Sequence, residues 1–291
     1  MKKHAWLLAL VLAASGFIAQ AGEKQLVLIA GTPSHGPGDH EFNAGCLLLQ
    51  KCLAKTPDLK VVVCKNGWPK DETVLDQADA VAVYSDGGGG HFLLKGDHMR
   101  KLGEMAKKGV GIGLMHFAVE ILKDKGGPEF LEWIGGYYED HYSCNPMWTP
   151  DYQKFPDHPI ARGVKPFAVR DEWYMNIRFR PNTQGITPIL VAKPSDQVRD
   201  GPYVWPAGPY PHVQANKGRD EAMMWAVERP DGGRGFGFTG GHYHKNWANE
   251  SYRRAVLNAL CWIAKVEVPA TGVVSTVTDD DLKPNLDPKG R

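Results

Sequence analysis

The stretch Gly109-Val-Gly-Ile-Gly-Leu-Met-His116-Phe-Ala-Val-Glu120 decides the fold. Residues Gly111–Met115 form a short apolar run rich in glycine, which is typical of a strand buried on both faces of a parallel sheet. Residues 117–122 are compatible with a helix and follow without a spacer. A strand that turns directly into a helix holds the residue at the turn in a tight bend at the carboxyl edge of the sheet, where open α/β sheets bind ligands. The sequence therefore places His116 at a candidate functional site.

A histidine at such a turn suggests acid–base chemistry, metal ligation or substrate binding. The alternative is a buried histidine whose ring nitrogens bond to backbone groups. Glu120 follows four residues later. If a helix begins at the turn, its carboxylate lies near the imidazole and can orient it and raise its pKa. We therefore predict that His116 and Glu120 act as a catalytic pair.

The N-terminus is typical of a secretory signal. Lys2 and Lys3 precede an apolar segment at residues 6–18, and Ala19-Gln20-Ala21 has the small-x-small pattern of a cleavage site. The apolar run is short for a membrane span. We expect cleavage after Ala21 and a periplasmic or secreted protein that has no membrane contact after cleavage.

The composition indicates one large domain. About 270 of the 291 residues follow the signal, 43% of the chain is apolar, and no linker divides residues 22–265. Residues 266–291 form a Pro-, Asp- and Lys-rich extension expected to wrap the surface or fray. The net charge of +1, with mixed signs, gives no indication of a nucleic-acid partner. A homo-oligomer is compatible with this composition. The five cysteines have no metal-type spacing, and we expect no disulfide framework.

Strands alternate with helices in the first half of the chain, which predicts a flavodoxin- or Rossmann-like α/β fold with helices on both faces of a parallel sheet. The predicted strands are 25–30, 60–64, 79–84 and Gly111–Met115, and the predicted helices are 41–54 and 95–108. The second half is less regular, with long ordered loops at 137–152 and 200–212, strands at 186–193, Glu221–Glu228 and 235–239, and a closing helix at 251–264.

The loop after the first strand contains His35 and His40. Its sequence, Gly31-Thr-Pro-Ser-His-Gly-Pro-Gly-Asp-His-Glu41, contains glycines but matches neither a P-loop nor GxGxxG. No nucleotide cofactor is therefore expected, and the two histidines are candidate substrate ligands at the sheet edge.

The loop after the third strand reads Asp86-Gly-Gly-Gly-Gly-His91. Its glycines allow the backbone to approach a ligand closely and to present amide donors. Asp86, Gly88, Gly89 and His91 are thus candidate substrate-binding residues. The alternative is a flexible turn with His91 in solvent.

Two later segments carry similar chemistry. In Asp171-Glu172-Trp173-Tyr174, Glu172 is a candidate second acid/base group, although a surface acid beside core aromatics fits the same pattern. In Gly240-Gly-His242-Tyr-His244-Lys-Asn-Trp247, two histidines spaced by two residues can point the same way from an extended backbone.

Together these residues resemble the trehalose-utilisation (ThuA-like) family, whose fold is similar to that of class I glutamine amidotransferases. The resemblance covers about residues 25–264. It rests on Gly-Leu-Met-His116, Trp-Ile-Gly-Gly-Tyr-Tyr138, Pro-Asp-His158-Pro-Ile, Asp-Glu-Trp-Tyr174 and Gly-Phe-Gly-Phe-Thr-Gly-Gly-His242. An amidotransferase has cysteine where this chain has His116, so glutaminase activity is not expected.

The resemblance implies a small-molecule carbohydrate as partner, in particular an oxidised (3-keto) glycoside. Nine tryptophans and ten tyrosines suit the C–H faces of a pyranose, and Trp148, Trp173 and Trp247 are candidate sugar contacts alongside His242 and His244. We expect a hydrolase or lyase that uses acid–base chemistry. A non-catalytic carbohydrate-binding protein is one alternative. A zinc hydrolase is another, since neutral imidazoles suit zinc, although no local HExxH signature is present and the metal residues stay unassigned.

Overall fold

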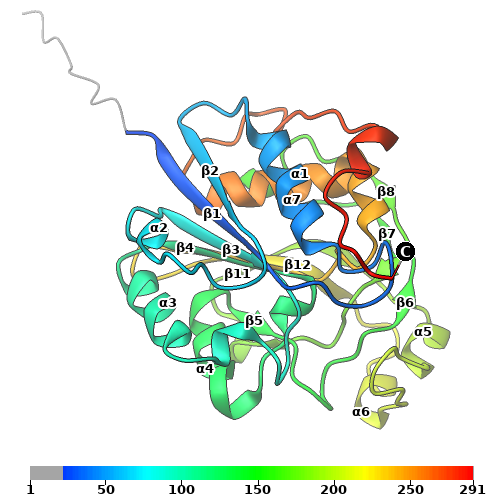
Figure 1. The fold of residues 1–291 in the computed structure, drawn as a ribbon. Coiled ribbons are helices and arrows are strands. Elements are labelled where there is room, and N and C mark those ends of the chain that lie inside the picture. The colour runs from blue at the N-terminus through cyan, green and yellow to red at the C-terminus, as the bar shows by residue number, and fades with distance from the viewer. Residues whose placement is uncertain (1–21, 291) are drawn as a thin grey trace, which may run out of the picture.

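The computed structural model describes residues 22–290, so the predicted signal segment 1–21 lies outside the described residues. A seven-stranded sheet in the order β11-β12-β13-β4-β3-β1-β2 forms the centre of the molecule (Figure 1). Its strands are β1 (Lys24–Ala30), β2 (Leu59–Cys64), β3 (Ala80–Tyr84), β4 (Gly111–Met115), β11 (Ile186–Ala192), β12 (Glu221–Glu228) and β13 (Arg234–Phe238).

The sheet is mostly parallel, which confirms the predicted fold class. Strands β2, β1, β3, β4 and β13 pair in parallel. Strand β12 is antiparallel to both β13 and β11. The connection from β12 to β13 spans only residues 229–233. Such a short connection forms a hairpin, because a parallel pair needs a longer crossover.

Helices cover both faces of the sheet (Figure 1). On one face lie α1 (Phe42–Leu53) and α7 (Glu250–Ile263), and on the other lie α2 (Thr73–Asp76), α3 (His98–Lys107) and α4 (Lys123–Trp133). Strand β1 shows why both faces are buried. Leu26 and Leu28 belong to the first core, and Val27 and Ile29 to the second. Successive strand residues point to opposite faces, so a continuous apolar run fills both cores.

Shorter elements complete the fold. They are β5 (Gly136–Tyr137), β6 (Met147–Trp148), β7 (Asp151–Tyr152), β8 (Phe167–Ala168), β9 (Asp171–Glu172), β10 (Arg178–Phe179), α5 (Asp196–Asp200) and α6 (Pro211–Gln214), with 3₁₀ helices η1 (Phe92–Leu94), η2 (His116–Val119), η3 (Pro159–Ala161), η4 (Pro181–Thr183), η5 (His244–Ala248) and η6 (Asp279–Leu282). All five cysteines are free. Within residues 22–290, no helix combines the length and apolar character needed to cross a membrane.

The topology determines where the predicted loops meet. Strands β1, β3, β4 and β13 run in one direction, so the segments after them all emerge at the same sheet edge. This confirms that the loops carrying His40, Asp86, His116 and His242 converge. The C-terminal extension also reaches this edge, because the backbone N–H of Asp287 donates to Glu41 Oε2 over 2.6 Å.

Candidate functional site

His116 occupies a tight turn between β4 and η2. Its φ is +57°, a region that residues other than glycine rarely adopt. The side chain is fully buried, and its ring lies 5.3 Å from that of Tyr174. The sequence prediction of a strained histidine at the carboxyl end of β4 is therefore confirmed.

Both ring nitrogens of His116 have partners. Nδ1 lies 3.0 Å from the backbone oxygen of Thr239. On the other side, Nε2 lies 3.0 Å from His40 Nε2 and 3.7 Å from Glu172 Oε2. This corrects the prediction that Glu120 orients the ring. The segment after His116 is a 3₁₀ helix that ends at Val119, so the α-helical i, i+4 relationship does not form.

His40 enters the site from the loop after β1. Its side chain is buried, and its Nδ1 lies 2.8 Å from Asp86 Oδ1 in the loop after β3. Its Nε2 faces His116 and also lies 3.0 Å from His242 Nδ1. His35 stacks on the outer side of this ring, with the ring centroids 3.6 Å apart.

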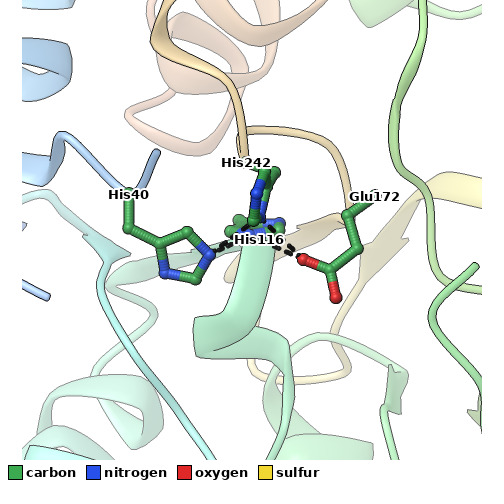
Figure 2. Close-up of side chains that lie close together, drawn as sticks. All are labelled: His40, His116, Glu172 and His242. Carbon is green, nitrogen blue, oxygen red and sulfur yellow. Dashed lines mark hydrogen bonds and ion pairs between the residues drawn. The ribbon is translucent and has the colours of Figure 1, made fainter. Parts of the chain in front are cut away.

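Glu172 and His242 complete the cluster, as Figure 2 shows. Glu172 Oε2 lies 2.8 Å from His242 Nδ1. The other oxygen of this carboxylate accepts a hydrogen bond of 2.7 Å from Asn145 Nδ2. His242 Nε2 points toward Asp39, at 3.7 Å from Oδ2. Both side chains are at least nine-tenths buried.

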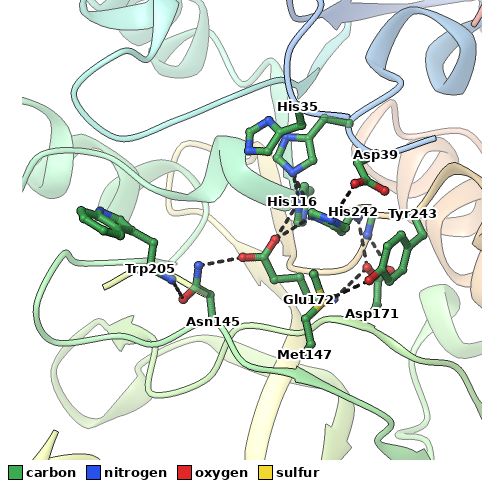
Figure 3. Close-up of polar contacts among 12 residues, drawn as sticks. His35, Asp39, His116, Asn145, Met147, Asp171, Glu172, Trp205, His242 and Tyr243 are labelled. Atoms are coloured by element: carbon green, nitrogen blue, oxygen red, sulfur yellow. Dashed lines mark hydrogen bonds and ion pairs between the residues drawn. The ribbon is translucent and has the colours of Figure 1, made fainter. Parts of the chain in front are cut away.

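Asp171 positions the loop that carries His242 (Figure 3). Its Oδ1 accepts from the backbone N–H groups of Glu172 and His242, at 2.9 and 3.1 Å. Its Oδ2 accepts from the N–H of Gly241 and from the Tyr252 hydroxyl, at 3.0 and 2.7 Å. Four donors thus converge on one buried carboxylate, which holds β9 and the β13–η5 loop together.

The surroundings set the protonation of the cluster. Burial, followed by neighbouring histidines, lowers the pKa of both His40 and His116 far below the usual range. Burial opposes protonation of His242 as well, but the hydrogen bond to Glu172 and the negative charges of Glu172, Asp39 and Asp171 together outweigh it, and the pKa of His242 is raised. Burial raises the pKa of Glu172. It also raises the pKa of Glu120 to about 8, assisted by Asp140 and Glu172. The first two histidines are therefore neutral, and Glu120 carries a proton near neutral pH.

The structure could accommodate a metal ion at this cluster. One nitrogen from each of His40, His116 and His242 and one oxygen from Glu172 all lie within 4.8 Å of one another. His35, His40 and Asp86 form a second, more exposed group that shares His40 with the first.

Several predicted site residues belong elsewhere. Trp148, Trp173 and Trp247 are buried in the hydrophobic core that also contains α7, so their faces are not open to a sugar. His91 is fully buried, and its ring bonds to the Ala118 carbonyl and the Leu93 N–H. It therefore neither lies in solvent nor contacts the cluster.

Two further residues predicted to contact substrate, His244 and Gly88, also belong elsewhere in the structure. His244 is buried at the start of η5 and is not one of the clustered ligands. The N–H of Gly88 donates to the backbone oxygen of Glu120 and is unavailable to a ligand. The glycines instead allow the loop to pack on η2, because a Cβ on Gly87 would lie 2.0 Å from the Phe117 oxygen. Gly89 is exposed.

Sequence reasoning missed the residues that hold the clustered ones. Asn145 and the Thr239 carbonyl bond to Glu172 and His116, and Asp39 lies 3.7 Å from His242, although each pair is far apart in the chain. A backbone carbonyl leaves no signal in the side-chain sequence. Asp171 belongs to the Asp171-Glu172-Trp173-Tyr174 motif, but its role in holding the His242 loop follows only from the four donors that it accepts in the fold.

The site is distinct from the apolar cavity beside β11 and β12. That cavity has a volume of about 360 Å³ and is lined by residues such as Tyr142, Phe179 and Glu221. None of the four clustered residues lines it.

The protein is therefore an α/β protein with a mostly parallel sheet and a histidine–carboxylate cluster at the carboxyl edge of that sheet. The chain belongs to the trehalose-utilisation (ThuA) family, whose model matches residues 27–263. It is similar to the solved structure of a ThuA-like protein from Parabacteroides merdae ATCC 43184, with 16% identity, a TM-score of 0.56, and coverage of 89% of this chain and 99% of the other. A ThuA-like protein from Bacteroides uniformis ATCC 8492 gives 13% identity, a TM-score of 0.55, and coverage of 86% and 95%. These two likenesses show the fold. No curated protein sequence matches the chain significantly.

Proposed function

We propose that this protein is an exported enzyme of carbohydrate metabolism that acts on a glycoside or 3-keto-sugar by acid–base chemistry. The observation that carries the proposal is the convergence of His40, His116, His242 and Glu172 at the carboxyl edge of the sheet. Ionisable groups brought together in a buried place are characteristic of active sites, because burial there tunes their proton affinities. Membership of the trehalose-utilisation family supports a sugar as the substrate.

The proposed reaction uses the two carboxyl groups in different roles. A keto group acidifies the neighbouring C–H bond, so the ionised carboxylate of Glu172 removes that proton through Oε1, the oxygen that faces Asn145 and not the histidines. The C–H electron pair forms a double bond, and the C–O bond to the glycosidic oxygen breaks. Glu120 carries a proton near neutral pH, since its pKa is raised to about 8, and it protonates the departing oxygen. Carboxyl groups whose environments separate their proton affinities commonly divide the acid and base roles in this way.

The burial of the aromatic side chains favours an enzyme over a sugar-binding module. Binding modules need open aromatic faces, and Trp148, Trp173 and Trp247 are buried. Trp205, by contrast, is 77% exposed. Its backbone N–H donates to Asn145 Oδ1 over 3.1 Å, and the same amide group holds Glu172 (Figure 3). We therefore assign Trp205 as an aromatic contact for the sugar.

Export is proposed from Lys2, Lys3, the apolar run at 6–18 and Ala19-Gln20-Ala21. Mass spectrometry of the mature protein from its native host is expected to show a chain that begins at Gly22. A mature chain that still begins at Met1 would contradict export.

The function is tested by incubating the purified protein with a 3-keto-disaccharide and with the parent, unoxidised disaccharide. Chromatography is expected to show cleavage of the keto compound. Cleavage of the parent alone would replace the elimination mechanism by direct glycoside hydrolysis. Saturable binding of either sugar without any turnover would favour the carbohydrate-binding alternative.

A further inference from the structure

The positions of protons on the clustered histidines are fixed by their outer partners. A backbone carbonyl only accepts hydrogen bonds, so the contact with Thr239 requires a proton on His116 Nδ1. The Asp86 carboxylate likewise requires a proton on His40 Nδ1. A neutral imidazole has one N–H. The Nε2 atoms of His40 and His116 are therefore both bare lone pairs, and they lie 3.0 Å apart.

This contact is repulsive unless something positive lies between the two nitrogens. A second proton on one ring would relieve it, but both side chains are at most 1% exposed, and burial strongly disfavours a charged imidazole. His40 Nε2 also lies 3.0 Å from His242 Nδ1. A single N–H on His40 would have to point at two nitrogens at once. A cation at the centre satisfies all three nitrogens together.

The outer partners have the arrangement found around protein-bound metals. Metal-ligating histidines usually donate their second N–H to a carbonyl or carboxylate, and ligating carboxylates are themselves hydrogen-bonded. Here His116 has the Thr239 carbonyl and His40 has Asp86. His242 Nε2 points toward Asp39. The second oxygen of Glu172 is held by Asn145.

The separations between the inner atoms fit tetrahedral coordination. Bonds of about 2.1 Å to nitrogen and oxygen place tetrahedral ligand atoms about 3.4 Å apart. The observed separations are 3.0 Å for His40–His116, 3.0 Å for His40–His242, 2.8 Å for His242–Glu172 and 3.7 Å for His116–Glu172. These four separations bracket the ideal value, and the other two pairs, His40–Glu172 and His116–His242, lie within 4.8 Å.

We propose that His40 Nε2, His116 Nε2, His242 Nδ1 and Glu172 Oε2 bind one divalent first-row transition-metal ion of the zinc class. Three imidazoles and one carboxylate suit zinc and its neighbours, whereas magnesium and calcium prefer oxygen ligands throughout. The inference deepens the proposed function, because the ion lies in the proposed active site and would polarise a substrate oxygen there. The role of the ion rests on the proposed function, whereas the metal site itself is inferred from the positions of the four ligand residues alone.

The test is a titration of the metal-free protein with Co²⁺, which reports four-coordination through its visible absorption, followed by displacement with Zn²⁺. The variants are Glu172→Gln and His116→Gln. The control is His141→Ala, which removes an exposed histidine outside the cluster. Circular dichroism and denaturant unfolding of each metal-free protein confirm that it is folded.

We expect one equivalent of tetrahedral Co²⁺ in the wild type and in His141→Ala, and affinity at least tenfold lower in both cluster variants. A folded wild type that takes up no Co²⁺ or Zn²⁺ would overturn the proposal, as would equal uptake by all four proteins. Metal uptake without turnover of a 3-keto-disaccharide would support the metal site and remove the sugar chemistry. Turnover by protein that binds no metal would support the sugar chemistry and overturn the metal site.

Discussion

His40 and His116 lie in loops 76 residues apart in the chain, and their Nε2 atoms are 3.0 Å from each other. The parallel order of β1, β3 and β4 explains this proximity, because it brings the loops after these strands to one edge. Asp86 and the Thr239 carbonyl then turn both rings so that their lone pairs meet. The fold thus concentrates donor atoms in a buried place, an arrangement that is unfavourable for stability alone.

Glu172→Gln is expected to lower keto-glycoside turnover by about 10²–10⁴-fold, since it removes a proton-transferring group. The fold should be retained, because glutamine has the same shape and its carbonyl oxygen still accepts from Asn145. The matched control is Glu104→Gln, which changes an exposed carboxylate on α3. Kinetics and thermal unfolding of both variants check this. A Glu172→Gln protein with normal turnover would exclude Glu172 as the base.

Glu120→Gln is expected to stabilise the protein at alkaline pH. The pKa of Glu120 rises from 4.5 unfolded to about 8 when folded, so the native state binds more protons between these values. Stability from this group is therefore full below about pH 4.5 and lost as the pH rises to about 8. The variant lacks this loss, which we put at about 1–3 kcal/mol after allowing for partial exposure. Denaturant unfolding at pH 6 and pH 9 should show the larger gain at pH 9, and an equal gain at both would contradict the raised pKa.

Asp171→Asn is expected to destabilise the protein by about 3–5 kcal/mol. Asp171 accepts from three backbone N–H groups and a hydroxyl, and the amide of asparagine would bring a donor against at least one of these donors. Because Gly241 and His242 lose their anchor, metal affinity should fall as well. The control is Asp220→Asn, an exposed carboxylate. Unfolding midpoints that are equal for the two variants would contradict this role of Asp171.

Lys289→Met is expected to loosen the loop that carries His40. The ammonium of Lys289 is almost fully buried and donates to the backbone oxygens of Asp39 and His40. The substitution removes one donor from each carbonyl, although that of His40 keeps the N–H of Phe42, and we expect a cost of about 1–2 kcal/mol. Lys283→Met, at an exposed position of the same extension, is the control. If proteolysis and unfolding do not distinguish the two variants, the extension has no role in holding the site.

The sequence predicted the sheet and the histidine turn because both depend on local patterns. Apolar runs such as Gly111–Met115 indicate buried strands wherever the rest of the chain lies. Helix α4 was not predicted, because its Gly126-Gly127-Pro128 segment is typical of a loop. The wrong partner for His116 arose because a 3₁₀ turn replaced the expected α-helix after it.

The remaining differences between the sequence predictions and the structure arise from tertiary packing. Trp173 and Trp247 lie in loop-like sequence, yet they fill the core beneath α7. The extension beyond residue 265 looked peripheral, yet Asp287 and Lys289 bond to the segment around His40. Asn145 reaches Glu172 across 27 residues. Contacts of this kind depend on the assembled fold and leave no periodic pattern in the chain.

The central claim is that His40, His116, His242 and Glu172 form one metal centre. The most direct measurement is X-ray diffraction from crystals grown with one equivalent of zinc, with data collected on both sides of the zinc absorption edge. We predict a single strong anomalous peak about 2.0–2.2 Å from the three ring nitrogens and the Glu172 oxygen. A well-ordered cluster with no anomalous peak among these four atoms would contradict the account.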